Sequence, residues 1–382
     1  MNAAGLRILH LIHTPRLSGA EVLVRNLCEV HSRQGVRCGV ASFNPSNDAF
    51  LDDAPATPAG AIEWFVPEAP QSRLGRLRNF HDAMSEFKPD VVLAHSVLPA
   101  LYGRAALVFR ANRPRFISVL HCASEDDYSD WKLCLTERAL QSRTDAIVTV
   151  SLSAQQNYRR RFGDKIPSFV VPNGIALSAS SYGDAERIHI RKALSVPNNH
   201  CLILQVGRLS EVKQQHCTLE AMLPVLKARP DTHLWFAGLK EDPEYAATLA
   251  RAVEAAGLED RVLFLGGRRD VPELLGCADA YVMPSLKEAH SVAFLEALAS
   301  GVPIVAADIS SFRFAARLPA VELVDPTNTD ALRAAITAAM GTSRVTRDLS
   351  AYDIVNTADA YLNCVSYVLG RAQIREMERN AQ

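Results

Sequence analysis

The chain has 382 residues, a length that predicts two domains, each large enough to bury a core of its own. Hydrophobic residues make up 48% and charged residues 22%, which excludes a disordered chain, and a net charge of −1 gives no general attraction to nucleic acid. The eight cysteines include no C-x-x-C pair, which favours free thiols in a reducing compartment. With no secretory leader and no apolar run long enough to span a bilayer, we expect a cytoplasmic protein.

The chain opens with an apolar strand and a helix whose start is well marked. Residues 7–12 read RILHLI, a run typical of a buried parallel strand. Ser18 and Glu21 have the spacing of a capping box, which predicts a helix over residues 20–34. Gly19 lies at the start of this helix, where backbone N–H groups can meet a phosphate. The G-x-G-x-x-G pattern of dinucleotide binders is not present here.

Strands and helices alternate through the rest of the first half. Such alternation predicts a parallel, doubly wound α/β sheet, whose ligands bind at the carboxyl ends of the strands. Two histidines, His95 and His121, occupy such ends, and His95 is interpreted as a packing or hydrogen-bonding residue. Strands are expected at 36–43, 62–66, 91–94, 116–120 and 146–150, and helices at 73–87, 100–111, 131–142 and 154–162.

The second half restarts the pattern after Asn173 and Gly174, a dipeptide suited to a tight turn. A strand over residues 202–206 runs into GRLSEVK, which places Arg208 and Lys213 at a strand end. A guanidinium and an ammonium in that position can neutralise a diphosphate, whereas two surface cations are the alternative. Further strands are expected at 233–237, 262–265, 280–283 and 304–307, and helices at 215–228, 243–256, 271–277, 292–300, 331–340 and 352–371.

Residues 284–308, PSLKEAHSVAFLEALASGVPIVAAD, combine a loop, a helix and a strand. Ser291 is a suitable N-cap for the helix that follows. Glu288 lies in the loop and Glu296 in the helix among apolar residues, where a carboxylate is rarely found without a partner. Two carboxylates beside a helix N-terminus indicate a polyhydroxylated, phosphorylated ligand, with a solvated helix glutamate as the alternative.

Glu288 and Glu296 form E-x7-E followed by ALASGVP, which resembles the donor-site motif of the retaining GT-B glycosyltransferases of family four, the glycosyl transferases group 1. The G-R-x-x-x-x-K run from Gly207 and the loop at Gly19 resemble two more elements of that family in the same order. The resemblance covers nearly the whole chain and implies an α/β fold of two Rossmann-like doubly wound domains facing across a cleft. The implied domains are an acceptor-side domain, 1–172, onto which a C-terminal helix at 352–382 packs back, and a nucleotide-sugar domain, 173–351.

The implied reaction moves a hexosyl unit, with retention of configuration, from a nucleotide diphosphate sugar to a small-molecule or glycan acceptor. A UDP-sugar is favoured over a GDP-sugar, and the donor is a substrate, so no cofactor is expected. No metal is expected either, because positive side chains and helix termini supply the charge that the leaving diphosphate needs. The resemblance implies catalytic roles for His121, Arg208, Lys213 and Glu288. It also implies donor contacts for Gly19, Gly267, Arg268, Ala289, His290, Ser291, Val292 and Glu296.

The chain departs from the family in two loops. Ser18 stands where the family usually has the first glycine of Gly-Gly-x-Glu, and it is expected near the acceptor. The donor loop reads Glu-Ala-His-Ser from Glu288 instead of Glu-Gly-Phe-Gly. The missing glycines restrict the backbone φ angles. His290 replaces an aromatic residue and can contact the donor sugar, so the resemblance does not specify which sugar is bound.

An acidic loop, CASEDDYSDW, follows His121 on the side where the family binds acceptors. Like charges in one loop repel, so a cationic ligand would stabilise it. We interpret this loop as a site for an amino-sugar or aminocyclitol acceptor held by Asp126, Asp127 or Asp130, with Tyr128 and Trp131 available to stack on its ring. A solvated loop and a bound divalent ion are the alternatives.

Three further functions remain open. A non-catalytic protein would bind the nucleotide sugar without transferring it, and a test for turnover distinguishes it from a glycosyltransferase. A phosphorylase-type enzyme would need more cations facing its acceptor. A peripheral membrane enzyme in cell-surface polysaccharide synthesis would take a lipid-linked acceptor and associate weakly with a membrane, an idea favoured by the arginines and apolar residues of 73–80 and by 159–161.

Overall fold

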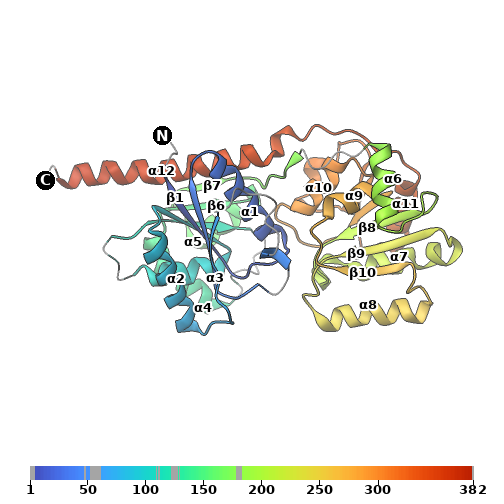
Figure 1. Ribbon diagram of the computed structural model, residues 1–382, viewed down its shortest axis with the longest axis horizontal. Helices are drawn as coiled ribbons and strands as arrows, with labels where there is room; N and C mark the ends of the chain where they lie inside the picture. The colour runs from blue at the N-terminus through green and yellow to red at the C-terminus, as the bar shows by residue number, and fades with distance from the viewer. Residues whose placement is uncertain are drawn as a thin grey trace. The chain divides into compact units, whose positions relative to one another are not determined.

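The computed structural model describes residues 5–46, 49–51, 62–108, 110, 112–121, 128, 130–177 and 183–380. The chain divides into two compact units, each built on one parallel sheet with helices on both faces (Figure 1). Unit 1 comprises Met1–Arg16, Ala20–Gly174 and Tyr352–Gln382, and unit 2 comprises Leu17–Gly19 and Ile175–Ala351.

In unit 1 the described strands form a parallel sheet in the order β3-β2-β1-β4-β5-β6-β7. The order in which the chain adds strands reverses between β1 and β4, and this point is called the sheet reversal below. Such a reversal opens a crevice at the carboxyl ends of the two strands, where doubly wound sheets bind ligands. The strands are β1 (Arg7–Ile12), β2 (Arg37–Ser42), β3 (Ile62–Phe65), β4 (Val91–His95), β5 (Arg115–Leu120), β6 (Ala146–Thr149) and β7 (Ser168–Val170). The helices are α1 (Gly19–Arg33), α2 (Arg73–Phe87), α3 (Val97–Ala106), α4 (Trp131–Leu140), α5 (Leu152–Phe162) and α12 (Ile354–Asn380).

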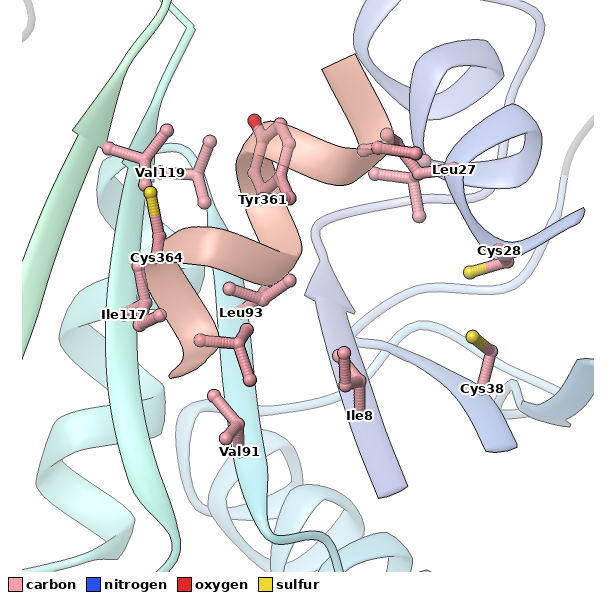
Figure 2. Packing of buried hydrophobic residues seen from close by; sticks show 14 of the residues in the cluster. Ile8, Leu27, Cys28, Cys38, Val91, Leu93, Ile117, Val119, Tyr361 and Cys364 are labelled. Atoms are coloured by element: carbon pink, nitrogen blue, oxygen red, sulfur yellow. The ribbon is translucent and has the colours of Figure 1, made fainter. Parts of the chain in front are cut away.

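The strands of unit 1 are mostly apolar because both faces of the sheet are covered. Ile8 packs with α1 and α12 on one face, whereas the next residue, Leu9, packs with α2 and α3 on the other. Figure 2 shows Tyr361 and Cys364 of α12 lying over Leu93 and Val119 of β4 and β5. The C-terminal helix is therefore part of the core of unit 1.

In unit 2 the sheet order is β10-β9-β8-β11-β12-β13, with the reversal between β8 and β11. One face packs against α7, α8 and α11, and α9 lies next to α6 and α10. The strands are β8 (Cys201–Val206), β9 (Thr232–Ala237), β10 (Val262–Gly266), β11 (Ala280–Met283), β12 (Ile304–Ala307) and β13 (Val321–Val324). The helices are α6 (Asp184–Ala193), α7 (Gln215–Ala228), α8 (Pro243–Ala256), α9 (Val271–Cys277), α10 (Val292–Ser300) and α11 (Thr329–Met340).

The predicted fold class is confirmed, and three local predictions need correction. Helix α3 begins at Val97, three residues earlier than expected, because Pro99 falls in the first turn, where proline is tolerated. Strand β13 and the short strand β7 are absent from the prediction. The last helix continues past Arg371 to Asn380.

The described cysteines are free thiols. In the described part of the chain we find no helix that is both long and apolar enough to cross a membrane.

Candidate functional site

Two loops flank the sheet reversal of unit 2 and carry most of the predicted donor residues. The first, 207–214, follows β8, and the second, 284–291, follows β11, the neighbouring strand. The N–H of Leu286 donates to the carbonyl of Val212 at 2.9 Å, which ties the two loops together. The carboxyl ends of β8 and β11 thus present one composite site, where doubly wound sheets bind ligands.

Two buried glutamines that sequence analysis missed hold the first loop. Gln205, inside β8, donates to the carbonyl of Lys213 at 2.8 Å and accepts from the Thr218 hydroxyl at 2.8 Å. Gln215 donates to the carbonyl of Arg208 at 2.9 Å. Both amides donate hydrogen bonds to the backbone of the two cationic residues, Lys213 and Arg208. The polar Gln205 within the apolar run LILQV is a sequence signal from which its buried hydrogen-bonding role could have been predicted.

Both predicted phosphate-binding cations are paired with carboxylates. The ammonium of Lys213 forms an ion pair with Glu288, and both side chains are mostly buried. The guanidinium of Arg208 pairs with Glu241, at a more exposed position. The Lys213–Glu288 pair joins the two loops and brings two predicted catalytic residues together. Glu241 was not predicted, because it follows a different strand.

The start of α10 is built as the sequence predicts. Ser291 caps the helix by accepting a hydrogen bond from the N–H of Phe294, and the following residue, Val292, begins it. Gly19 lies against that first residue: a Cβ atom on Gly19 would be 3.6 Å from the Cβ of Val292. Ser18 directly precedes it in the short segment grouped with unit 2. This corner therefore combines backbone N–H groups with the positive end of the α10 dipole.

The charges of Glu288 and Glu296 both act on one buried tyrosine. The pKa of Tyr281, on β11, is raised first by burial and then by the charges of these two glutamates. Burial raises the pKa of Glu296 to about 7. Among the described residues the Glu296 carboxylate has no hydrogen-bond or ion-pair partner. A desolvated carboxylate of this kind is an unsatisfied hydrogen-bond acceptor, which hydroxyl groups of a ligand can satisfy.

We expect Glu296→Gln to stabilise the protein at high pH and to have little effect on stability at low pH. The folded pKa lies above the ordinary value of 4.5, so ionising Glu296 disfavours the folded state. This penalty grows as pH rises from 4.5 to 7, and it reaches at most about 3 kcal/mol above that range. Urea unfolding of both proteins at pH 4, 6 and 8 measures it. Equal stability at pH 8 would contradict the desolvation of Glu296.

The loop after β10 is compact, and its arginine already has a partner. A Cβ atom on Gly267 would lie 2.7 Å from the Leu239 side chain, so a larger residue would require that side chain to move. Arg268 makes two hydrogen bonds to Asp270, at 2.8 and 2.5 Å. Like Arg208 and Lys213, Arg268 is paired with a carboxylate, and its predicted contact with the donor stays a prediction.

Ala289 and His290 are enclosed in the donor loop. Ala289 is buried. The imidazole of His290 stacks on Phe314 at a centroid distance of 5.8 Å, and burial lowers its pKa to about 4. His290 is thus a neutral aromatic surface. Phe314, from the turn after β12, is a neighbour that the sequence did not reveal.

In unit 1, His121 ends a row of three stacked histidines. His10 Nδ1 and His95 Nε2 are 2.9 Å apart, and His95 Nδ1 and His121 Nε2 are 2.8 Å apart. Burial lowers the pKa of His121 to about 4 and that of His10 to about 3, with a smaller contribution from His31 for His10. Burial also lowers the pKa of His95, with further contributions from its two neighbours. The row is therefore neutral at physiological pH.

Tyr128 corrects the interpretation of the acidic loop. Its side chain is only 7% exposed, its ring packs against Phe162 at 4.7 Å, and its hydroxyl donates to Glu137 at 3.2 Å. Tyr128 is a core residue and does not stack on an acceptor. Asp126 and Asp127 lie outside the described residues, so their predicted role stays a prediction.

The basic helix α2 also differs from its interpretation as a membrane-facing element. Phe80, Met84 and Phe87 are buried in the core of unit 1, and Arg76 lies over the ring of Tyr102 at 5.5 Å. Leu74 alone is strongly exposed among the large apolar residues of this helix. The apolar side of α2 therefore serves the fold.

Comparisons with known proteins agree with this architecture. Residues 17–179 match the family described as Glycosyltransferase Family 4, and residues 186–353 match Glycosyl transferases group 1. EpsF of Bacillus subtilis (strain 168) is 28% identical over 322 residues, which cover 81% of this chain and 80% of EpsF. The UDP-Gal:alpha-D-GlcNAc-diphosphoundecaprenol alpha-1,3-galactosyltransferase of Escherichia coli is 26% identical over 324 residues, 80% of each chain.

The solved structure of Anabaena Alr3699/HepE in complex with UDP and glucose has a similar fold. It superposes with a TM-score of 0.73 at 20% identity, over 98% of this chain and 100% of that one. The fold is thus that of the GT-B glycosyltransferases. The chain belongs to the group 1 glycosyltransferases and is a hexosyltransferase-type enzyme.

Proposed function

We propose that this enzyme transfers a hexosyl unit from a UDP-sugar to a glycan acceptor with retention of anomeric configuration and without a metal ion. The observation that carries the proposal is the Lys213–Glu288 pair, which joins the two loops at the sheet reversal of unit 2 close to the start of α10. The name of the Escherichia coli relative gives UDP-Gal as its donor, and HepE was solved with UDP and glucose. A UDP-sugar is therefore preferred to a GDP-sugar.

In the proposed reaction the bond between the anomeric carbon and the diphosphate oxygen breaks, and the electron pair leaves with UDP. The acceptor hydroxyl forms the new bond on the same face, and its proton passes to the departing diphosphate. Lys213, Arg208 and the N–H groups at Gly19 and Val292 stabilise the charge that develops on that diphosphate. Glu296 accepts hydrogen bonds from the ribose hydroxyls and Glu288 from the donor sugar. His121 contacts the transferred sugar.

The proposal is tested by turnover in the presence of a chelator. We expect UDP and a UDP-sugar to raise the Tm in EDTA, because a ligand that binds only the folded state stabilises it by mass action. We also expect release of UDP on addition of a glycan acceptor, with an anomeric proton coupling in the product that shows retention. Activity that is lost in EDTA and restored by Mg²⁺ or Mn²⁺ would refute metal independence. Binding without turnover on any acceptor would favour a nucleotide-sugar-binding protein.

A second candidate is that the acceptor is lipid-linked, and a specific surface favours it. Helix α4 exposes Trp131 (65%) and Leu135 (53%), four residues apart and so on one face of the helix. Lys132 lies over the Trp131 ring at 5.8 Å, and Arg138 follows one turn later. Exposed aromatic and aliphatic side chains among cations are typical of helices that lie on anionic membranes. The Escherichia coli relative is named for an acceptor linked to diphosphoundecaprenol.

We expect the chain to sediment with vesicles that contain anionic phosphatidylglycerol, and the double variant Trp131→Ser, Leu135→Ser to sediment less. Ile188→Ser, at an equally exposed apolar position of unit 2, is the matched control and should bind like the wild type. Binding should weaken as salt rises, because the cations of α4 contribute to it. Equal sedimentation of the double variant and the wild type would exclude this surface.

A further inference from the structure

Three basic side chains gather at the carboxyl end of β1, which borders the sheet reversal of unit 1. His13 and Arg16 follow β1, and Arg76 lies in the first turn of α2. Burial lowers the pKa of His13, the charges of Arg76 and Arg16 lower it further, and among the described residues no carboxylate raises it. Because a nearby carboxylate would raise that pKa, this corner of unit 1 is electropositive.

Packing contacts hold Arg76 beside the segment that follows β1. The Arg76 guanidinium lies over the ring of Tyr102, on α3, at 5.5 Å. That ring packs edge-on against Phe43, the residue after β2, at a centroid distance of 5.2 Å. The N–H of Phe43 in turn donates to the carbonyl of His13 at 3.2 Å. The ends of β1 and β2 and the start of α2 therefore form one continuous surface.

Neither arginine of this surface is hydrogen-bonded to a carboxylate in the part of the chain that the structure describes. Arg76 Nε is buried without a hydrogen-bond partner, and no described carboxylate lies within ion-pair distance of Arg76. Arg16 Nε also lacks a hydrogen-bond partner, and its contact with the Glu21 carboxylate is 4.0 Å long. The predicted donor cations of unit 2, in contrast, are each paired with a carboxylate. A partly desolvated guanidinium without such a partner indicates a site for an external anion.

The number of guanidinium groups indicates which anion fits. One guanidinium is enough to bind both oxygens of a carboxylate. A phosphate carries nearly two negative charges and three acceptor oxygens, so it can engage two guanidinium groups at once. We propose that Arg16 and Arg76 form an anion subsite of unit 1 that binds a phosphate or diphosphate group of the acceptor. The identity of the ligand as an acceptor rests on the proposed function, whereas the binding of the anion does not.

His13 reports on anion binding before any acceptor is known. The full chain is first saturated with UDP, which occupies the donor site, and inorganic pyrophosphate is then added while the His13 ring protons are followed by NMR through a pH titration. A His13→Gln variant assigns the signal. We expect pyrophosphate to raise the pKa of His13, because it offsets the two guanidinium charges. An unchanged His13 titration at high pyrophosphate would overturn the proposal.

Two variants and a matched control locate the bound anion. Arg16→Gln and Arg76→Gln should each raise the Kd of pyrophosphate about tenfold in the UDP-saturated protein, through the loss of one charge-assisted contact. Arg78→Gln removes the same charge from the same helix and should bind like the wild type, because Arg78 is 87% exposed and lies 3.9 Å from Asp82. Arg16→Gln keeps the test valid if Arg76→Gln unfolds. Equal Kd values in the variants and the control would show that no subsite exists here.

Turnover with a UDP-sugar identifies the source of the phosphate. Competition by glucose 1-phosphate indicates a sugar phosphate acceptor, and stronger competition by farnesyl diphosphate indicates a lipid-linked one. Either result supports the subsite if Arg16→Gln and Arg76→Gln raise the acceptor KM with little change in the donor KM. Preference for a neutral or amino-sugar acceptor, with an unchanged acceptor KM in both variants, would refute it. If the wild type transfers no sugar from any nucleotide donor, the proposed function fails, and the pyrophosphate measurements still decide whether the subsite exists.

Discussion

Lys213→Ala is expected to lower kcat/KM with a UDP-sugar by roughly 10²–10³, with the fold intact. A preorganised positive group at a developing anion stabilises the transition state more than the ground state, and removal of one such group typically costs this much. The Lys213 ammonium is largely screened from solvent by its pairing with Glu288, so water replaces it poorly. Arg208→Ala should show a loss of the same order, because a guanidinium binds two phosphate oxygens at once.

Two variants separate the charge of Lys213 from its structural effect. Lys213→Ala leaves Glu288 without its partner, whereas Lys213→Ala combined with Glu288→Gln removes both charges. If Lys213→Ala is inactive only because Glu288 is left unpaired, the double variant should reach the turnover of Glu288→Gln alone, and the assigned role of Lys213 would be wrong. Lys227→Ala, at an exposed position near the end of α7, should leave kcat/KM unchanged.

The fold was largely predictable because the local signals agree. The bounds of β1, α2, α7 and α10 match the patterns, and at α10 an apolar run, the Ser291 cap and the glycine end at Gly301 coincide. Strand β13 lacks such agreement: it is four residues long, lies at the sheet edge and includes the exposed Glu322. A short, half-exposed edge strand has little apolar periodicity to recognise.

Residues of the candidate site were predictable where they belong to short motifs and not where they are brought in by tertiary pairing. E-x7-E and G-R-x-x-x-x-K indicated Glu288, Glu296, Arg208 and Lys213 from the sequence. The partners Glu241 and Phe314 come from other strand ends, and only the strand order brings them near. His95 was interpreted as a hydrogen-bonding residue, but its row with His10 and His121 requires β1, β4 and β5 to be adjacent.

The interior of unit 1 contains a charged hydrogen-bond network that no sequence pattern predicted. Arg104 of α3 and Glu137 of α4 are both about 1% exposed, and their side chains are joined by two hydrogen bonds of 2.8 and 2.5 Å. Arg104 also donates to Thr144, while Tyr128 and Tyr158 donate to Glu137 at 3.2 and 2.7 Å. Burial alone would raise the pKa of Glu137, but the charge and hydrogen bonds of Arg104, together with the hydrogen bonds from Tyr158 and Tyr128, outweigh burial, and the pKa is lowered.

Glu137→Leu is expected to destabilise unit 1 by about 3–5 kcal/mol, because removing one partner leaves the Arg104 guanidinium charged and buried. Arg104→Met combined with Glu137→Leu should recover much of that loss, since an apolar pair of similar volume carries no unpaired charge. Urea unfolding followed by tryptophan fluorescence reports on this unit through Trp64 and Trp131, and on unit 2 through Trp235. Glu254→Leu, on the exposed side of α8, is the matched control and should change stability by no more than about 0.5 kcal/mol. Glu137→Leu with the stability of that control would show that the network contributes nothing, and a double variant as unstable as the single one would place its value in the tyrosine hydroxyls instead.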